Sequence, residues 1–164
     1  MGTQLFESLG QACTWAAEHG LREKAVCFVV RGEDLLVFDH VPAEDSGVQL
    51  PAGGLESDET PAQAAIRELH EESGLILGLP VHLRSYEWKA QLPDRWTQQV
   101  CHAFAFTAPP TTPEAWQCRA DEHRFAFRWA PVSNPGLDWE MDAALPDLQL
   151  HLSLSKSLSK QESR

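Results

Sequence analysis

The sequence predicts one α+β domain, built as an α/β/α sandwich with a mixed β-sheet between helices. Its 164 residues suit a single domain, since domains commonly run to about 100 to 150 residues. Segments with strand-like alternation lie between segments with helical spacing, and the apolar share of 43% is typical of a globular protein. We expect the domain to occupy residues 1–152, and residues 153–164, which lack a core-forming pattern, to be a mobile tail.

The first expected elements are a helix and a hairpin. Apolar residues at helical spacing predict a helix over residues 4–19, which ends before Gly20. The apolar runs at residues 25–30 and 35–40 flank the turn-forming residues 31–34. This pattern predicts two strands joined by a tight turn.

A second helix has signals at both of its ends. Thr60 is a good N-cap, Pro61 fits the first helical position, and Gln63 can complete a capping box. Gly74 supplies the stop. This helix also has an apolar stripe that can pack under a sheet, formed by Ala62, Ala65, Ile66 and Leu69.

Three further strands and a helix complete the expected elements. Residues 80–90, 97–107 and 124–130 alternate in the manner of strands. Residues 138–152 can form a last helix, which Pro146 would start or interrupt. Helices therefore lie before, between and after the strands along the chain, which favours the layered sandwich.

Composition excludes several classes of partner. The formal net charge of −11 argues against a nucleic-acid polymer as the main partner, because phosphate backbones need a basic footprint. No apolar stretch approaches the roughly 18 residues of a membrane span. The N-terminus lacks the basic flank of a secretory signal, so we expect a cytoplasmic protein that does not enter a membrane.

The four cysteines are expected to be reduced structural thiols. They lie far apart and form no CxxC pair, so they suggest neither a zinc site nor a redox motif. Two of them fall in strand-like apolar runs and are expected to be small buried hydrophobes. The four residues are Cys13, Cys27, Cys101 and Cys118.

The most informative stretch is the run GGLESDETPAQAAIRELHEESGL, which starts at Gly53. It brings Glu68, Glu71 and Glu72 onto one helical face, where like charges repel by a few tenths of a kcal/mol per pair. A cation is the simplest compensation, and carboxylate ligands alone indicate a hard ion such as Mg2+ or Mn2+. A glycine lets the backbone approach a ligand closely, so a carbonyl in the loop can add one more oxygen.

The spacing within this run resembles the Nudix box, G-x5-E-x7-R-E-U-x-E-E-x-G-U, in which U is aliphatic. Gly53 starts the pattern, Glu59 follows after five residues, and Arg67 follows after seven more. Every specified position is filled, over about a seventh of the chain. The resemblance implies a Nudix-type α/β/α sandwich and a Mg2+-dependent pyrophosphohydrolase, with Mn2+ as an alternative ion. The substrate would be a nucleotide or another nucleoside diphosphate derivative, cleaved at its diphosphate linkage.

The resemblance also implies a role for each matching residue. Metal ligands would be Glu68, Glu71, Glu72 and the carbonyl of Gly53, while Arg67 would orient a catalytic glutamate, and Glu59 and Gly74 would be structural. The catalytic base would be either Glu68 or a carboxylate beyond the box. Glu122 is our outside candidate, favoured over its neighbour Asp121, and an ordinary surface loop is its alternative reading.

Two tryptophans are candidates for substrate binding. Trp88 and Trp96 flank an expected turn between strands and would border a cleft there. Stacking of a base on an aromatic ring contributes about 1 to 3 kcal/mol. The alternative for both is packing, which is the usual role of tryptophan and the one expected for Trp15, Trp129 and Trp139.

Two other kinds of function remain open from the sequence. One is a non-hydrolytic enzyme on a Nudix fold, such as a diphosphate isomerase, although the sequence places no cysteine beside an acid or base in the way that allylic isomerisation would suggest. The other is a catalytically silent nucleotide-binding module, and the complete set of box residues counts against it. The expected partner is a small nucleotide or diphosphate substrate, and a homodimer is compatible with the resemblance.

Overall fold

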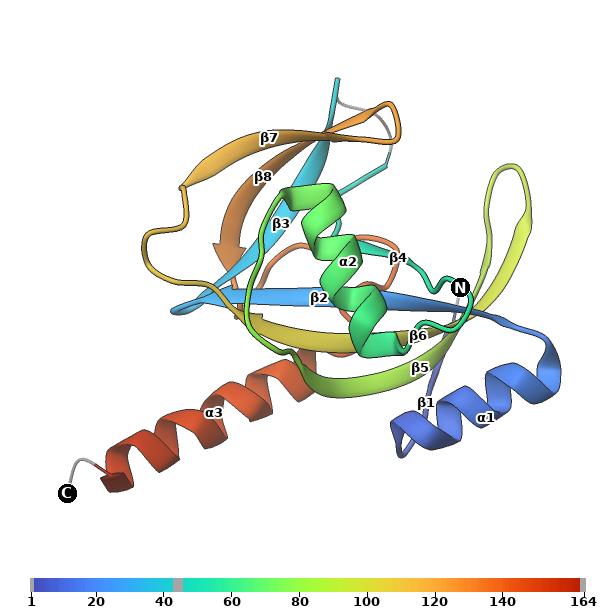
Figure 1. Ribbon diagram of the computed structural model, residues 1–164, viewed down its shortest axis with the longest axis horizontal. Coiled ribbons are helices and arrows are strands. Elements are labelled where there is room, and N and C mark those ends of the chain that lie inside the picture. Colours follow the sequence, from blue (N-terminus) through green and yellow to red (C-terminus); the bar gives the residue numbers. More distant parts are fainter. Residues whose placement is uncertain (1, 43–45, 163–164) are drawn as a thin grey trace.

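The fold is a β-sheet covered by helices on both faces (Figure 1). Successive residues of a strand point to opposite faces of a sheet. On the central strand, Val26 packs in one hydrophobic core with Leu148 of the last helix. Its neighbour Ala25 packs in a second core with Leu69 of the central helix. The α/β/α sandwich expected from the sequence is therefore confirmed.

The sheet is mixed. This computed structural model describes residues 2–42 and 46–162. The strand order is β1-β5-β6-β2-β3-β8-β7, with β4 paired to β2 beside this path. Strands β2 and β6 run parallel, and the other pairs are antiparallel. The strands are β1 (Gly2–Leu5), β2 (Arg22–Arg31), β3 (Asp34–Val41), β4 (Ala52–Gly54), β5 (Val81–Gln91), β6 (Trp96–Thr107), β7 (Ala115–Ala120) and β8 (His123–Pro131).

One edge of β2 has two partners, and this arrangement positions the candidate site. The end of β2 pairs with β3 through Val30 and Arg31. Earlier in the strand, Lys24 to Val26 pair with β4. The sheet therefore divides along this edge, with Ala52 of β4 nearest to the division and the glycine pair next to it along the strand.

Helix α2 (Pro61–Ser73) forms where the sequence predicts it. Thr60 and Gln63 make the reciprocal hydrogen bonds of a capping box, at 3.2 and 2.9 Å. Gly74 ends the helix with φ of 80°, a left-handed conformation that favours glycine. The apolar stripe packs on the sheet, because Ala65 and Leu69 are fully buried.

The N-terminal segment differs from the expected helix over residues 4–19. Residues Gly2–Leu5 form strand β1, which pairs with β5, and helix α1 covers Leu9–His19. Ser8 has extended backbone angles and its side chain accepts a hydrogen bond from the N–H of Gln11. This N-cap starts the helix later than apolar spacing alone suggests.

The C-terminal segment also differs from its prediction. Helix α3 covers Leu145–Glu162, so it starts beside Pro146 and continues through most of the expected tail. Residues 163–164 lie outside the described part of the chain. The helix packs at its start, where Leu148 is fully buried, and Figure 1 shows its later turns extending away from the sheet. Among the described residues, no helix is long and apolar enough to cross a membrane.

The long strands were predictable and the short ones were not. The expected strands at residues 80–90 and 97–107 correspond to β5 and β6, which pair in an antiparallel hairpin. Strands β1 and β4 have only four and three residues, too few for a periodic signal. Strand β7 does alternate between half-buried and exposed residues, but it follows a proline-rich loop that masks its start.

Candidate active site

The carboxylates around α2 are organised by one arginine, Arg67. Its Nε and Nη2 atoms donate to the two carboxylate oxygens of Glu59 at 2.8 and 2.9 Å, in a bidentate pair. Nη2 also donates to the carbonyl of Gly54 at 2.9 Å, while Nη1 donates to Glu68 at 2.8 Å and Glu71 at 3.2 Å. The hydrogen bond from Arg67 lowers the pKa of Glu59. Arg67 therefore ties the loop before α2 to the glutamates on the helix.

Glu72 is the buried glutamate of the group, with 9% of its surface exposed. The backbone N–H of Ala52 donates to its Oε1 at 3.2 Å. Burial, and then the neighbouring carboxylate of Glu68, raises the pKa of Glu72 to about 8. Two carboxylates this close in a buried place are unfavourable as a charged pair unless a cation or a proton compensates them.

The surroundings of these carboxylates fit a hard divalent cation. A Cβ added at Gly53 would overlap the carboxylate of Glu68, so only glycine leaves this side chain its place against the backbone. Carboxylate oxygens and backbone carbonyls are the donors that Mg2+ and Mn2+ take. Glu68, Glu72 and the backbone at Gly53 supply such donors. Glu71 lies nearer to solvent, with half of its side chain exposed.

Two adjoining cavities lie next to the carboxylates. The smaller has a volume of about 290 Å³ and is lined by the three glutamates of α2. The larger has a volume of about 680 Å³ and lies between β4 and the β5–β6 hairpin. Both are lined by Arg22, Lys24, Gln49, Ala52 and Gly53. A ligand in the larger cavity can therefore extend directly to the carboxylates.

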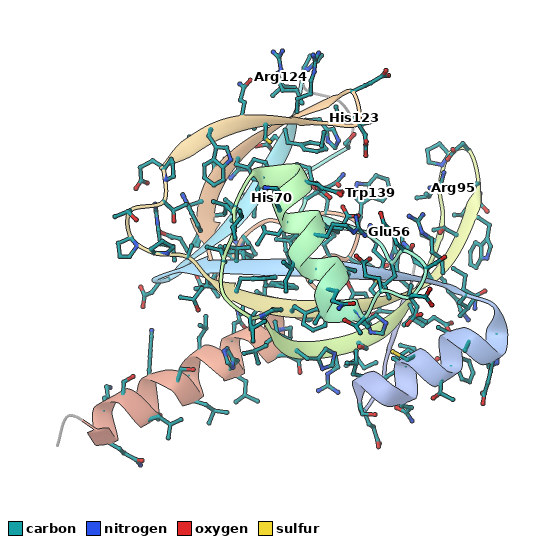
Figure 2. All side chains as sticks on the ribbon, viewed as in Figure 1. Glu56, His70, Arg95, His123, Arg124 and Trp139 are labelled. Atoms are coloured by element: carbon teal, nitrogen blue, oxygen red, sulfur yellow. The ribbon has the colours of Figure 1, made fainter. Side chains whose placement is uncertain are left out.

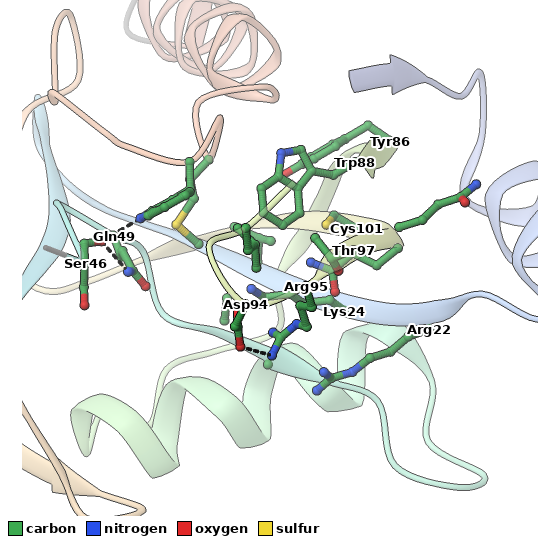
Figure 3. A pocket seen from close by; sticks show the side chains of 18 of the residues that line it. Arg22, Lys24, Ser46, Gln49, Tyr86, Trp88, Asp94, Arg95, Thr97 and Cys101 are labelled. Atoms are coloured by element: carbon green, nitrogen blue, oxygen red, sulfur yellow. Dashed lines mark hydrogen bonds and ion pairs between the residues drawn. The ribbon is translucent and has the colours of Figure 1, made fainter. Parts of the chain in front are cut away.

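The larger cavity has a basic wall and an aromatic wall. Figure 3 shows Arg22, Lys24 and Arg95 on one side, and the rings of Tyr86 and Trp88 on the other. Arg95 comes from the β5–β6 hairpin, and its Nη1 lies 3.6 Å from Oδ2 of Asp94. This combination suits a ligand with an anionic part and a flat ring.

The tryptophans do not follow their sequence assignments as a group. Trp88 is 9% exposed and lines the larger cavity, whereas Trp96 is 57% exposed and is not among its lining residues. Trp139, for which packing is expected, also lines the cavity. Its indole Nε1 donates to the carbonyl of Ser46 at 2.7 Å, which orients the ring. In Figure 2, Trp139, Arg95 and His123 come from three separate segments and lie along one side of α2.

Glu122 lies at the tip of a tight hairpin turn. Asp121 and Glu122 have φ of 47° and 66° between paired residues of β7 and β8, which is the pattern of a two-residue type I′ turn. Asp121 and His123 line the smaller cavity, and Glu122 is not among its lining residues. The ring of His123 meets that of His40 edge-on, with centroids 5.8 Å apart, and His40 also lines this cavity.

The basic residues at the start of β2 were missed in the sequence, although a signal exists for them. Arg22 and Lys24 are two residues apart in a strand, so they share a face with Val26 of the core. A pair of basic residues that continues a buried face marks the point where a core gives way to a polar cavity. Arg22 is also close to the box, because a Cβ on Gly54 would overlap its guanidinium.

Comparisons with known proteins agree with this architecture. A NUDIX hydrolase from Nitrosomonas europaea superposes with a TM-score of 0.61 at 16% identity, over 80% of this chain and 90% of that one. A MutT NUDIX hydrolase from Burkholderia pseudomallei superposes with a TM-score of 0.60 at 20% identity, over 77% of this chain and 96% of that one. At these identities the two structures show the fold alone.

A relative by sequence is the RNA pyrophosphohydrolase of Xanthomonas campestris pv. campestris (strain B100). It is 45% identical over 82 residues, which cover 46% of this chain and 40% of that protein. The match thus spans less than half the length of this relative. The family profile of the NUDIX domain matches residues 21–148, which is most of the chain and includes the whole glutamate-rich segment. The chain therefore belongs to the Nudix family.

Proposed function

We propose that this protein is a Mg2+-dependent pyrophosphohydrolase that cleaves the diphosphate linkage of a nucleotide or nucleoside diphosphate derivative. The observation that carries the proposal is the adjoining pair of cavities, one with carboxylates and one with basic and aromatic walls. The first suits a divalent cation and the second suits the organic part of a phosphorylated substrate. Family membership and the hydrolase relatives support the reaction class.

Some residues of this chain would bind the metal ion, and others would orient the group that accepts a proton. Glu68, Glu71, Glu72 and the carbonyl of Gly53 would hold the ion. A bound Mg2+ supplies charge neutralisation for the pyrophosphate and lowers the pKa of the attacking water. Arg67 would keep Glu68 oriented through its 2.8 Å hydrogen bond.

We assign the proton-accepting role to Glu68 rather than to Glu122. A base must lie within hydrogen-bond reach of the water, directly or through one other water. Glu68 lines the smaller cavity beside the other carboxylates, whereas Glu122 lies at a turn tip outside its lining. Of the residues around that turn, Asp121 and His123 line the cavity and could contact a substrate there.

The larger cavity supports a nucleotide as the substrate class. Arg22 and Lys24 line both cavities, so they can contact phosphates that bridge the two. Trp88 and Trp139 both line this cavity, and stacking on an indole ring is a common way to bind a base. The side chains of Gln49 and Gln99 line the same space and can donate to or accept from a base edge.

The 5′ end of an RNA is a second candidate substrate, because the relative from Xanthomonas campestris is an RNA pyrophosphohydrolase. An RNA end presents the same phosphates and base as a free nucleotide, followed by a polyanionic chain. The formal net charge of −11 opposes that chain, because binding to several phosphates needs a basic surface. We therefore favour the free nucleotide.

A substrate panel tests both candidates. Nucleotides, nucleotide sugars, dinucleoside polyphosphates and a 5′-triphosphorylated RNA oligonucleotide are incubated with the full chain and with Mg2+ or Mn2+. Chromatography separates the products, which are phosphate or pyrophosphate from triphosphates and phosphate monoesters or mononucleotides from nucleotide sugars and dinucleoside polyphosphates. Cleavage of a free nucleotide derivative, and not of the RNA, is the expected result. Faster cleavage of the RNA end would establish the second candidate. No cleavage of any compound with either ion would contradict the proposed reaction and favour an isomerase or a binding module.

Localisation and assembly stay predictions. A cytoplasmic location and a homodimer are compatible with the fold, and the oligomeric state can be measured by light scattering of the purified chain. The single-domain boundary at residue 152 also stays a prediction, although it falls within helix α3.

A further inference from the structure

A second group of potential metal ligands lies away from α2. Cys13 of α1, Glu23 of β2 and His102 of β6 each offer one donor atom, and these atoms all lie within 4.8 Å of one another. His102 Nε2 is 2.9 Å from Glu23 Oε1 and 4.0 Å from Cys13 Sγ. No residue of the glutamate-rich segment takes part in this group.

The imidazole of His102 is held in place from its other side. The side chain is fully buried, and its Nδ1 lies 2.6 Å from Ser85 Oγ. Ser85 Oγ in turn lies 2.9 Å from Nε2 of His82. Histidines that bind metals usually have the second ring nitrogen engaged in this way, since the hydrogen bond fixes both the tautomer and the ring orientation. Nε2 is therefore left to face Glu23 and Cys13.

The donor separations are close to those of a tetrahedral zinc site. Zinc bonds of about 2.3 Å to sulfur and about 2.0 to 2.2 Å to nitrogen and oxygen place neighbouring donors about 3.3 to 3.6 Å apart. The separations of His102 Nε2 from Glu23 Oε1 and from Cys13 Sγ, 2.9 and 4.0 Å, lie on either side of this range. Rotation about the single χ1 of Cys13 and movement of the partly exposed Glu23 can close the difference. The 27% exposure of the Glu23 side chain also provides an entry path.

We propose that Cys13, Glu23 and His102 form a zinc site, with three protein ligands and a fourth position open to solvent. The thiolate and imidazole donors select Zn2+ over Mg2+, whereas the all-oxygen donors of α2 select the harder ion. Binding would join α1 to β6 and to β2, the strand whose Arg22 and Lys24 line both cavities. The site is independent of the proposed hydrolase function, since it shares no ligand with the α2 carboxylates.

Cobalt substitution tests the site with a spectroscopic readout. Reduced, chelator-treated full-length protein is titrated with Co2+, which takes zinc ligands and absorbs in the near ultraviolet only when a thiolate is bound. We expect saturation at one equivalent and displacement of the band by Zn2+. Co2+ bound by the carboxylates of α2 lacks this band. The Glu72→Gln variant, which changes only the α2 carboxylates, should therefore show the same band as the wild type.

Matched variants assign the band to its ligands. Cys13→Ser should abolish it, and Cys118→Ser, which removes another partly buried thiol, should preserve it. Ser85→Ala should weaken affinity about 10- to 100-fold by releasing the imidazole. No thiolate band in the reduced wild-type protein, or an equal band in Cys13→Ser, would overturn the proposal. X-ray absorption of the zinc-loaded wild type gives a check without variants: one sulfur neighbour supports the site, and a shell of nitrogen and oxygen alone rejects it.

Discussion

The two groups of potential metal ligands lie on the same face of the sheet, yet the chain assembles them in opposite ways. The first, the α2 group, consists of Glu68, Glu71 and Glu72, which helical spacing brings together within one continuous segment. The second, the Cys13 group, consists of Cys13, Glu23 and His102. Cys13 and Glu23 lie 89 and 79 residues from His102 in the sequence and meet it only through the tertiary fold. The first group offers only oxygen, and the second offers sulfur, nitrogen and oxygen.

This difference shows that local structure can place the ligands of one site, whereas the other site depends on the register between strands. A helix sets the relative positions of side chains three and four residues apart, so a local pattern predicts a local site. His102 faces Glu23 only because β6 pairs with β2 in one register, and it faces Ser85 because these two residues are partners across β5 and β6. A shift of one residue would turn each side chain to the other face.

Loss of the proposed base, Glu68, should have the largest effect on turnover and should leave the Cys13 group unchanged. Glu68→Gln removes a metal ligand and a proton acceptor at once, and we expect turnover to fall about 10³-fold or more. Glu122→Gln should change turnover less than about threefold, since this residue lies outside the cavity lining. Steady-state kinetics at saturating Mg2+ measure both. A larger loss in Glu122→Gln than in Glu68→Gln would reverse the assignment.

Glu72→Gln should reduce turnover about 10²-fold while leaving the protein folded. Burial and the carboxylate of Glu68 raise the pKa of Glu72, which favours its neutral form when no metal is bound, and glutamine resembles that neutral form. Denaturant unfolding should therefore give a free energy close to that of the wild type. Glu18→Gln, at an exposed position of α1, is the matched control. Turnover near the wild-type value in Glu72→Gln would remove this residue from the metal ligands.

The α2 group was predictable because its signals are local, and the rest of the site was not. Thr60, Pro61 and Gly74 mark the ends of the helix, and Glu59 and Arg67, which form the bidentate pair, are both fixed positions of the box. Nothing local indicates that Trp139 would turn toward the cavity, since it lies in an irregular segment with φ of 58°. The dependence on tertiary structure is greatest for the Cys13 group.

The same reasoning explains the misplaced ends of the chain. The apolar residues of 4–19 allow a helix throughout, and the choice of a strand for Gly2–Leu5 depends on the free edge of β5, a tertiary partner. For residues 153–162 the sequence shows little amphipathic pattern, and the helix continues from a start that is anchored by Leu148. Helix propagation from an anchored turn costs less than nucleation, which composition does not reveal.

Gly53→Ala tests whether the backbone at β4 leaves room for a carboxylate. The added Cβ would overlap the carboxylate of Glu68 and displace it, so we expect a loss of about tenfold in turnover with the fold retained. Gly78→Ala is the matched control, because a Cβ there meets nothing within 4 Å. The thiolate–cobalt band should be the same in both variants, since neither touches the Cys13 group. Unchanged turnover in Gly53→Ala would show that Glu68 tolerates displacement.

The smallest expected effect concerns Glu59, which holds Arg67 in place beside the α2 group and is not itself a proposed metal ligand. Glu59→Gln replaces a charge-assisted bidentate pair with Arg67, and we expect a loss of about 1 to 2 kcal/mol in the free energy of unfolding at pH 7. Arg67 holds the pKa of Glu59 below its ordinary value of 4.5, so the unfolded chain binds the proton more tightly than the folded protein. The stabilisation is then complete above about pH 4.5 and disappears as the pH falls through the lower folded pKa. Urea unfolding of both proteins from about pH 7 to about pH 3 should show the difference shrinking toward zero. A difference that stays constant across this range would mean that Glu59 acts through packing and not through its charge.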